Sequence, residues 1–327
     1  MMVKLFLLLT LTQTADTLDL SNCSDRPHKR KEISAAVIQK YSSIILDCNG
    51  LNDLSKYDFQ NVEYLKLSMN PLSTLDSQTP FSNLIHLDIT DTNIYLFPKS
   101  LCAATKLKRI DSFGGSLSKA SCLSEMESLE ILNLDFIELD SAVDFSRSKL
   151  KNISVAFGKD TTVNLAILNQ IGVLNQLTRL GMLDFNFRIS QLADLNNKHQ
   201  IEVLSVSLTN DDFFCEFIEE VSTWKELKTL KVTINNRTVP SCLGSLTNIK
   251  TLILRSKRGN GKIYIPLESL NLKNLESVYD FKNIKDFLTN KSSIAVIVES
   301  PFQLSDFERL GLETTVYSNP TYILESK

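Results

Sequence analysis

A leucine spacing that recurs along nearly the whole chain constrains its fold more than any other feature. The pattern is clearest at Val62, Leu65, Leu67, Asn70 and Leu72. The copies from 41 to 275 begin at Tyr41, Val62, Leu84, Leu107, Leu129, Leu150, Leu177, Ile201, Leu227, Ile249 and Leu275, which are 21 to 27 residues apart. A degenerate copy lies near Lys291, and a last weak copy begins at Leu312. A period of this length predicts a solenoid of stacked units.

The pattern Leu-x-x-Leu-x-Leu-x-x-Asn-x-Leu, with Val62 in its first position, resembles that of the leucine-rich-repeat superfamily from Tyr41 to the C-terminus. The resemblance stops at the superfamily. No cysteine follows Cys242, whereas animal extracellular members usually carry a four-cysteine flank after the last repeat, and the Gly-x-Ile-Pro signature of plant-type repeats is missing. The resemblance implies an α/β solenoid: a horseshoe with a parallel concave β-sheet and short 3₁₀ or α-helical convex segments.

The leucine spacing has a simple physical basis. The chain has 51 leucines, enough to occupy most of the repeated positions. Both leucines of Leu-x-Leu point inward from a short strand, so the intervening residues line one exposed face. The asparagine side chain can bond backbone groups that lose their partners where the chain leaves the strand. Apolar spacing predicts helical return segments at 163–174 and 211–223.

The expected organisation is a signal peptide at 1–17, an N-terminal cap at 18–40, about 11–12 repeats at 41–300 and a C-terminal repeat and cap at 301–327. Lys4 precedes the apolar run 5–11, and Ala15 is a plausible cleavage point. That run is too short to span a bilayer. We therefore expect a secreted, extracellular protein without membrane insertion.

Six cysteines allow fifteen pairings. Cys102 and Cys122 lie 18 and 15 residues after the starts of neighbouring repeats, and Cys215 and Cys242 lie 14 and 15 after theirs. Equivalent offsets in adjacent coils bring side chains within disulfide range. The predicted pairs are therefore Cys102–Cys122, Cys215–Cys242 and, from the remaining two, Cys23–Cys48. The alternative is six reduced, buried thiols, against which the leader argues.

Four Asn-x-Ser/Thr triplets are candidate glycosylation sites: Asn22, Asn152, Asn236 and Asn290. Asn152 is expected to face outward on a concave strand, where a glycan would cover part of any binding surface. We therefore expect a ligand to bind away from Asn152, or this site to be unmodified.

Motifs for catalysis, metals and cofactors are missing from the sequence. His28, His86 and His199 are scattered, and we expect no metal and no cofactor. His86 beside Asp88 is conceivable as an acid–base pair, but a solvated or partner-facing histidine is the simpler interpretation. The formal net charge of −3, with no basic run longer than 28–31, argues against nucleic-acid binding.

Three function classes remain open. The favoured one is a secreted, non-enzymatic recognition module, expected to be monomeric, that binds a protein or glycan on its concave face. The alternatives are a self-associating extracellular coat or matrix protein, and an enzyme or enzyme inhibitor. Fold alone does not decide between them.

The outward strand positions predict a binding site in the N-terminal half. The candidate residues are Tyr64, His86, Asp88, Asp91, Arg109, Asp111, Phe113, Asp135 and Phe136. Asp88, Asp111 and Asp135 are expected to form one acidic row with Phe113 and Phe136 at its edge, so the partner would present basic groups. An ordinary solvated sheet of mixed polar residues is the alternative. Corresponding positions in later repeats are smaller and slightly basic: Ser205, Ser207, Thr229, Lys231, Thr233 and Arg255.

Overall fold

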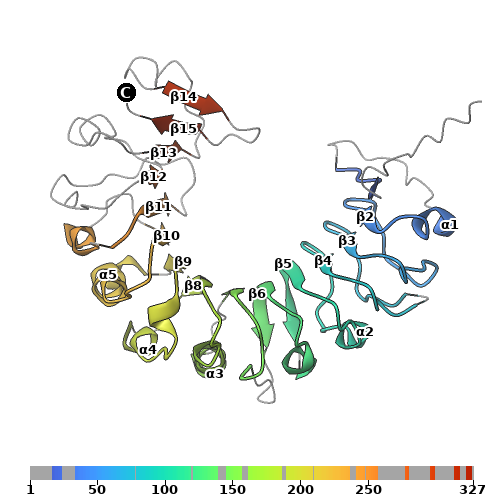
Figure 1. Ribbon diagram of the computed structural model, residues 1–327, viewed down its shortest axis with the longest axis horizontal. Helices are drawn as coiled ribbons and strands as arrows, with labels where there is room; N and C mark the ends of the chain where they lie inside the picture. The colour runs from blue at the N-terminus through green and yellow to red at the C-terminus, as the bar shows by residue number, and fades with distance from the viewer. Residues whose placement is uncertain are drawn as a thin grey trace, which may run out of the picture.

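A computed structural model gives the architecture, which is a curved solenoid built on one sheet (Figure 1). It describes residues 17–23, 34–77, 79–118, 121–138, 145–156, 161–185, 189–208, 210–235, 241–246 and 248–256, and four further strands within 277–325. From β1 to β13 the strands follow chain order and pair in parallel, whereas β15 and β14 complete the sheet in antiparallel fashion. The parallel concave sheet predicted from the repeats is confirmed.

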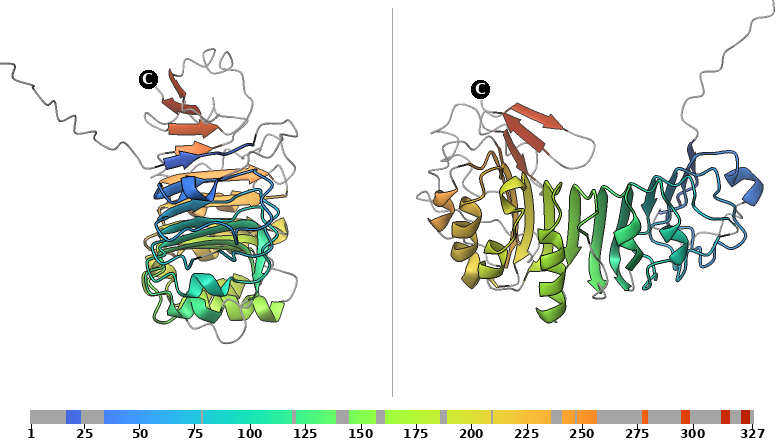
Figure 2. Two further views of the ribbon diagram at one scale, coloured as in Figure 1. Left: turned by 90° about the vertical axis from the view of Figure 1, so that its right-hand side faces the viewer. Right: turned by 60° about the horizontal axis from the view of Figure 1, so that its bottom comes forward.

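The strands face the inside of the arc (Figure 1). Their bounds are β1 Thr17–Asp19, β2 Ser43–Ile45, β3 Tyr64–Lys66, β4 His86–Asp88, β5 Arg109–Ser118, β6 Ile131–Glu138, β7 Asn152–Ala156, β8 Arg179–Phe185, β9 Val203–Leu208, β10 Thr229–Ile234, β11 Thr251–Ser256, β12 Ser277–Tyr279, β13 Ala295–Val298, β14 Glu313–Val316 and β15 Tyr322–Glu325. The helical segments lie on the outside (Figures 1 and 2). They are α1 Ala35–Ile38, α2 Lys99–Cys102, η1 Ser121–Glu125, α3 Thr161–Gly172, α4 Ile189–Ala193, η2 Lys198–Gln200, η3 Asp211–Phe213, α5 Phe214–Ser222 and η4 Ser241–Ser245.

The leucine positions form a continuous core between the sheet and the outer segments. Leu65, Leu87, Ile110 and Leu132 are partners across neighbouring strands, and none exposes any surface. Burying each such side chain contributes about 1.5–3 kcal/mol relative to leaving it exposed. Because every repeat adds one layer of this kind, the core extends along the solenoid rather than around a single centre.

The outer segments change along the chain as the repeat spacing lengthens. In the repeat that begins at Val62, the segment 71–77 is irregular, apart from a single bridge between Leu54 and Ser77. The predicted helix at 163–174 is α3, and the one at 211–223 consists of η3 and α5. In α5, Phe214, Phe217, Ile218 and Val221 are buried on one face. A helix is wider than a strand, which curves the stack away from it.

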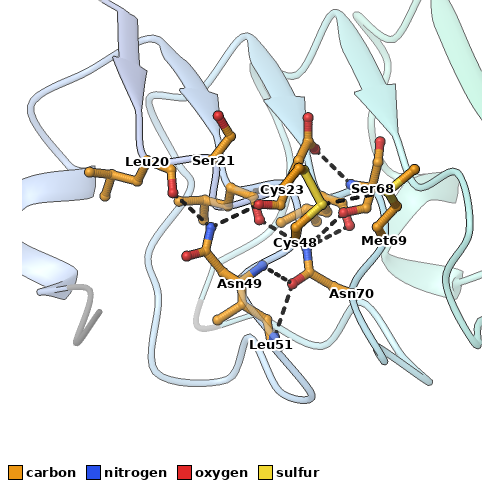
Figure 3. The surroundings of a disulfide bond; sticks show 12 residues. Leu20, Ser21, Cys23, Cys48, Asn49, Leu51, Ser68, Met69 and Asn70 are labelled. Carbon is orange, nitrogen blue, oxygen red and sulfur yellow. Dashed lines mark hydrogen bonds between the residues drawn. A yellow bond between two sulfur atoms is a disulfide. The ribbon is translucent and has the colours of Figure 1, made fainter. Parts of the chain in front are cut away.

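The asparagine position works as the spacing predicts in the early repeats (Figure 3). Asn70 is buried, and its Nδ2 donates to the carbonyl oxygens of Leu46 and Leu67 at 2.9 and 2.8 Å. Its Oδ1 accepts from the amides of Asn49 and Leu51, both at 3.0 Å. One side chain thus satisfies backbone groups of two adjacent coils.

In later repeats, the backbone just after the second leucine position has different hydrogen-bond partners. In β9 and β10 the strand continues past the second leucine-type position, so Ser207 pairs with Thr233 in the sheet ladder. The strands β2 to β4, by contrast, have only three residues each and end near an asparagine or a threonine. After β4 this residue is Thr92, whose Oγ1 donates to the carbonyl oxygen of Ile89 at 2.8 Å. In the longer strands the backbone pairing extends to this part of the chain, while side-chain bonding persists at Asn235, whose backbone amide donates to Oδ1 of Asp211 at 2.9 Å.

The N-terminal cap adds a strand to the sheet. Strand β1 begins at Thr17, the last residue assigned to the expected leader, and pairs in parallel with β2. Residues 1–16 lie outside the described residues, so the leader stays a prediction. At the other end, β14 covers part of the last weak repeat but pairs antiparallel with β15. The C-terminal segment therefore does not add a further parallel strand.

All six cysteines are disulfide-bonded, in the three predicted pairs. The Cα atoms are 5.0 Å apart in Cys23–Cys48 and 5.6 Å apart in both Cys102–Cys122 and Cys215–Cys242. Cys23–Cys48 joins the cap to the strand end of the first repeat, next to Asn49 (Figure 3). The other two join neighbouring outer segments, α2 to η1 and α5 to η4.

Truncating a core leucine should destabilise the protein strongly. Leu87→Ala removes a side chain with no exposed surface, which should lower the free energy of unfolding by about 2–5 kcal/mol. Leu96→Ala is the matched control because Leu96 is 55% exposed, and it should change stability by less than about 1 kcal/mol. Urea denaturation of both variants measures this. Equal losses would contradict the assignment of Leu87 to the core.

Peptide mapping without reduction tests the disulfide assignment. The protein should yield three crosslinked peptide pairs, each joining cysteines of neighbouring coils, and no alkylated thiol. A crossed pairing, such as Cys48 with Cys102, would show that the coils stack in a different order.

Candidate functional site on the concave face

The outward side chains of the strands form two rows across the concave sheet. The first row runs Ser43, Tyr64, His86, Arg109, Ile131, Asn152, Arg179, Val203, Thr229 and Thr251. The second row runs Ile45, Lys66, Asp88, Asp111, Asn133, Ser154, Gly181, Ser205, Lys231 and Ile253. Because register fixes each neighbour, these rows determine which side chains can act together.

Asp111 is the centre of a polar network that spans three strands. Its Oδ2 lies 2.8 Å from Nε2 of His86 on β4 and accepts from Nε of Arg109 at 2.7 Å. Its Oδ1 accepts from Nδ2 of Asn133 on β6 at 2.6 Å and from Nη2 of Arg109 at 3.2 Å. The Asp111 side chain is only 8% exposed, whereas that of Arg109 is 44% exposed. A covered carboxylate thus holds the more exposed His86 and Arg109, and the buried Asn133, in place.

The network also determines the charge state of Asp111. Burial alone would raise the pKa of this carboxyl, but the hydrogen bonds from His86, Arg109 and Asn133, with the charge of Arg109, hold the pKa well below its usual range. Asp111 is therefore ionised at neutral pH. Its charge is balanced within the network by the guanidinium of Arg109.

The expected acidic row is wrong at Asp135. Asp88 and Asp111 are partners across β4 and β5, but Asp111 is opposite Asn133 on β6, so Asp135 does not continue the row. Both carboxylate oxygens of Asp111 are also bonded within the protein. Asp111 therefore positions its neighbours rather than meeting a partner directly.

The expected pair of aromatic side chains at the edge of that row does not follow from the register. The pairing of β5 with β6 shifts between Ser112 and Ser116, so Phe136 is opposite Ser116, three residues beyond Phe113. A bulge of this kind inserts residues into one strand and offsets all later partners. Phe113 is half-buried, and its carbonyl accepts from the amide of Asp91 at 2.6 Å. Asp91 itself is exposed and has a positive φ of 54°.

Tyr64 and Asp88 complete the surface around this network. The Tyr64 ring is 45% exposed and meets the His86 ring edge-on, with centroids 6.3 Å apart. Asp88 is half-buried, and its Oδ1 accepts from the amide of Thr90 at 3.0 Å. His86 thus contacts Tyr64 and bonds to Asp111, which lies diagonally across the two strands, rather than forming the acid–base pair with Asp88 that the sequence made conceivable.

The candidate glycosylation sites differ in their surroundings. Asn22 is half-exposed, and its amide donates to the carbonyl of Asp47 at 3.0 Å. Asn152 is half-exposed in the first concave row, between Ile131 and Arg179, as expected. Asn236 and Asn290 lie outside the described residues. None of the four is shown to be modified, so all remain predictions.

No group of three or more His, Cys, Asp or Glu side chains in the described part of the chain could hold a metal ion. None of its helices is both long and apolar enough to cross a membrane.

The sequence reasoning missed the Asp111 network, although its signal was present. Arg109 and Asp111 are two residues apart on one strand and so share a face. His86 and Asn133 occupy outward positions on the two flanking strands. An acidic side chain with donors beside it on its own strand and on both flanking strands is expected to bond to them. Asp111 is in this position, so it could have been expected to bond within the protein.

Replacing Asp111 should cost stability in a pH-dependent way. Asp111→Asn removes a charge that three donors stabilise, so the free energy of unfolding at pH 7 should fall by roughly 2–3 kcal/mol. The folded pKa lies below the unfolded value near 3.9, so this stabilisation is present above about pH 4 and is lost as pH falls towards the folded pKa. Denaturation curves of wild type and variant between pH 7 and pH 3 measure the difference.

Asp194→Asn is the control for this experiment, because Asp194 is exposed. It should leave stability within about 0.5 kcal/mol of wild type. A difference between wild type and Asp111→Asn that grows as pH falls would contradict the ionised, hydrogen-bonded state of Asp111.

Comparisons with known proteins give no sequence match and several distant structural similarities. The sequence matches no protein-family model and no curated protein. Among solved structures, a Leptospira interrogans leucine-rich-repeat protein is 17% identical over 85% of this chain and 84% of its own, with a TM-score of 0.44. Internalin C2 from Listeria monocytogenes is 17% identical over 61% and 81%, with a TM-score of 0.39. Human 5T4, the trophoblast glycoprotein, is 14% identical over 73% and 88%, with a TM-score of 0.40.

Similarity at these identities and TM-scores carries no argument about the function or the partners of this chain. The fold itself rests on the chain's own features: the leucine period, the in-register parallel strands and the buried asparagine that bonds two coils. The chain is a leucine-rich-repeat solenoid.

Proposed function

We propose that this chain is a secreted, non-enzymatic recognition module that binds a protein through the N-terminal half of its concave face. The single observation that carries the proposal is the Asp111 network, in which one covered carboxylate orients His86, Arg109 and Asn133 from three strands. The proposed contact residues are Tyr64, His86, Asp88 and Arg109.

Preorganisation is the physical reason for placing the site here. Association costs about 0.5–1.5 kcal/mol for each flexible side chain that must be immobilised. Arg109 is already held by two hydrogen bonds to Asp111, yet 44% of its side chain is exposed. Tyr64 is also exposed, and it lies against His86. Tyrosine and arginine are the residue types that most often dominate binding energy at interfaces.

The centre of the concave face offers less to a partner. Its second row there consists of Ser154, Gly181 and Ser205, and a Cβ atom added at Gly181 would lie 2.9 Å from Cβ of Ser154. Small side chains in close contact provide little area for specific binding. The second row therefore offers fewer anchoring groups in the centre than between β3 and β5.

The other parts of the proposal rest on separate features. The apolar leader and the three disulfides favour an oxidising, extracellular compartment. The non-enzymatic assignment is supported by the bonding of His86, since its partner Asp111 also accepts from Arg109 and Asn133. This carboxylate serves a shared structural role rather than that of a dedicated partner for one catalytic histidine.

Affinity capture with matched variants tests this function. Purified mature protein is immobilised and exposed to extracellular extracts, and retained proteins are identified by mass spectrometry. Tyr64→Ala with Arg109→Ala should weaken capture of the partner at least about tenfold, since each removes an anchor. The control, Thr229→Ala with Lys231→Ala, changes one residue of each row on β10 and should retain the partner.

Two outcomes would contradict the proposal. Loss of the partner in the β10 control, with retention by the Tyr64 and Arg109 variant, would place the site in the other half. Concentration-dependent oligomers in sedimentation velocity, with no retained partner, would instead indicate a self-associating coat or matrix protein.

A further inference from the structure

The starts of the concave strands form a second surface, along one edge of the sheet. The residue just before each strand lies beside the corresponding residue of the preceding repeat. Its backbone amide donates a hydrogen bond to the carbonyl oxygen of that residue. Glu130 bonds to Lys108, Lys151 to Glu130 and Thr178 to Lys151, each at 2.9 Å. These backbone bonds place the four residues side by side in a continuous line.

This edge carries a concentration of positive charge. We define the cationic rim as Lys108, Lys149, Lys151 and Arg179, all of them exposed. Glu130 lies among them and pairs with Lys151, with Oε2 and Nζ 3.0 Å apart. Three lysines thus lie around one carboxylate, with Arg179 two strands from β6, in a chain whose formal net charge is −3.

The electrostatics of Glu130 support this proximity. Its pKa is lowered chiefly by the hydrogen bond from Lys151, and further by the charges of Lys151, Lys108 and Lys149. Three ammonium groups therefore act on a single acid that balances only one of them. The nearby pair of Arg147 and Glu127, 2.8 Å apart, is balanced and adds no net charge.

The spacing of the rim suits a linear ligand. Adjacent strands are about 4.8 Å apart, so Lys108 and Lys151, two strands apart, are separated by about 10 Å along the rim. Arg179 lies one strand further, at about 14–15 Å from Lys108. A line of cations at these intervals fits an extended polymer with regularly repeated negative charges better than a single small anion.

The chemistry of the neighbouring side chains distinguishes between polyanions. Binding of single-stranded nucleic acid relies on aromatic side chains on which bases stack. Ile131, Asn152 and Thr178 lie beside the rim cations, and none is aromatic. Hydroxyl and amide groups among cations suit a sugar polymer with carboxylate or sulfate groups.

We propose that the cationic rim binds a linear acidic polysaccharide. This surface is distinct from the proposed protein site around Tyr64 and Arg109, and the inference does not depend on that site. The contacts are mainly electrostatic, so binding weakens as salt rises, because counter-ions are released from the polymer.

The test measures binding of the full mature chain to heparin, a sulfated polysaccharide, by calorimetry at several salt concentrations. The protein is produced in a bacterial periplasm, which forms disulfides, in a strain without N-glycosylation, so that no sugar on Asn152 covers the rim. The variant carries Lys108→Gln, Lys149→Gln and Arg179→Gln, which leaves the Glu130–Lys151 pair intact. The matched control carries Lys40→Gln, Lys99→Gln and Lys225→Gln, three exposed lysines away from the rim.

Heparin should bind wild type and control equally, and the rim variant at least about tenfold more weakly, with about three fewer counter-ions released. Neutral dextran should not bind. Equal loss of binding in the control, or binding independent of salt, would overturn the proposal. Tighter binding of a single-stranded oligothymidine than of heparin would overturn it in favour of nucleic acid. Capture of the protein partner through Tyr64 and Arg109 should be unaffected in the rim variant.

Discussion

Parallel hydrogen bonding between the strands of consecutive repeats is the interaction on which the rest of this structure depends. It fixes register, and register turns a leucine spacing along the chain into layers of core such as Leu65, Leu87 and Ile110. The same bonding aligns the outward residues in rows and the strand starts in a rim. Core, concave site and cationic rim are thus three consequences of one pairing scheme.

The architecture could be predicted because it depends on periodic, local chemistry. Inward residues must be apolar at fixed intervals, so the repeat starts and the disulfide pairs of adjacent coils follow from counting. Two structural elements escaped this reasoning. Strand β1 lies before the first recognisable repeat, and β15 pairs antiparallel with β13 and β14. Neither carries the leucine spacing that marked the other strands.

The site was predicted only in part, because outward direction and exposure are different properties. Tyr64, His86 and Arg109 line the concave face as expected, but neighbours from two strands cover Asp111. The bulge between Ser112 and Ser116 also changes which residues face each other. No period in the sequence marks an irregularity of this kind, since it arises from the fit between one pair of strands.

The distribution of the disulfides has a mechanical consequence. Each joins only neighbouring coils, and the coils between Cys122 and Cys215 contain none. The stretch from β7 to β9 is therefore held by non-covalent contacts: strand pairing, apolar packing and side-chain bonds such as those from Asn197 to the carbonyl oxygens of Ile171 and Leu174. If the two ends of the arc were pulled apart, the coils of this stretch could separate without breaking a covalent bond. The coil pairs that Cys102–Cys122 and Cys215–Cys242 join on either side of it could not.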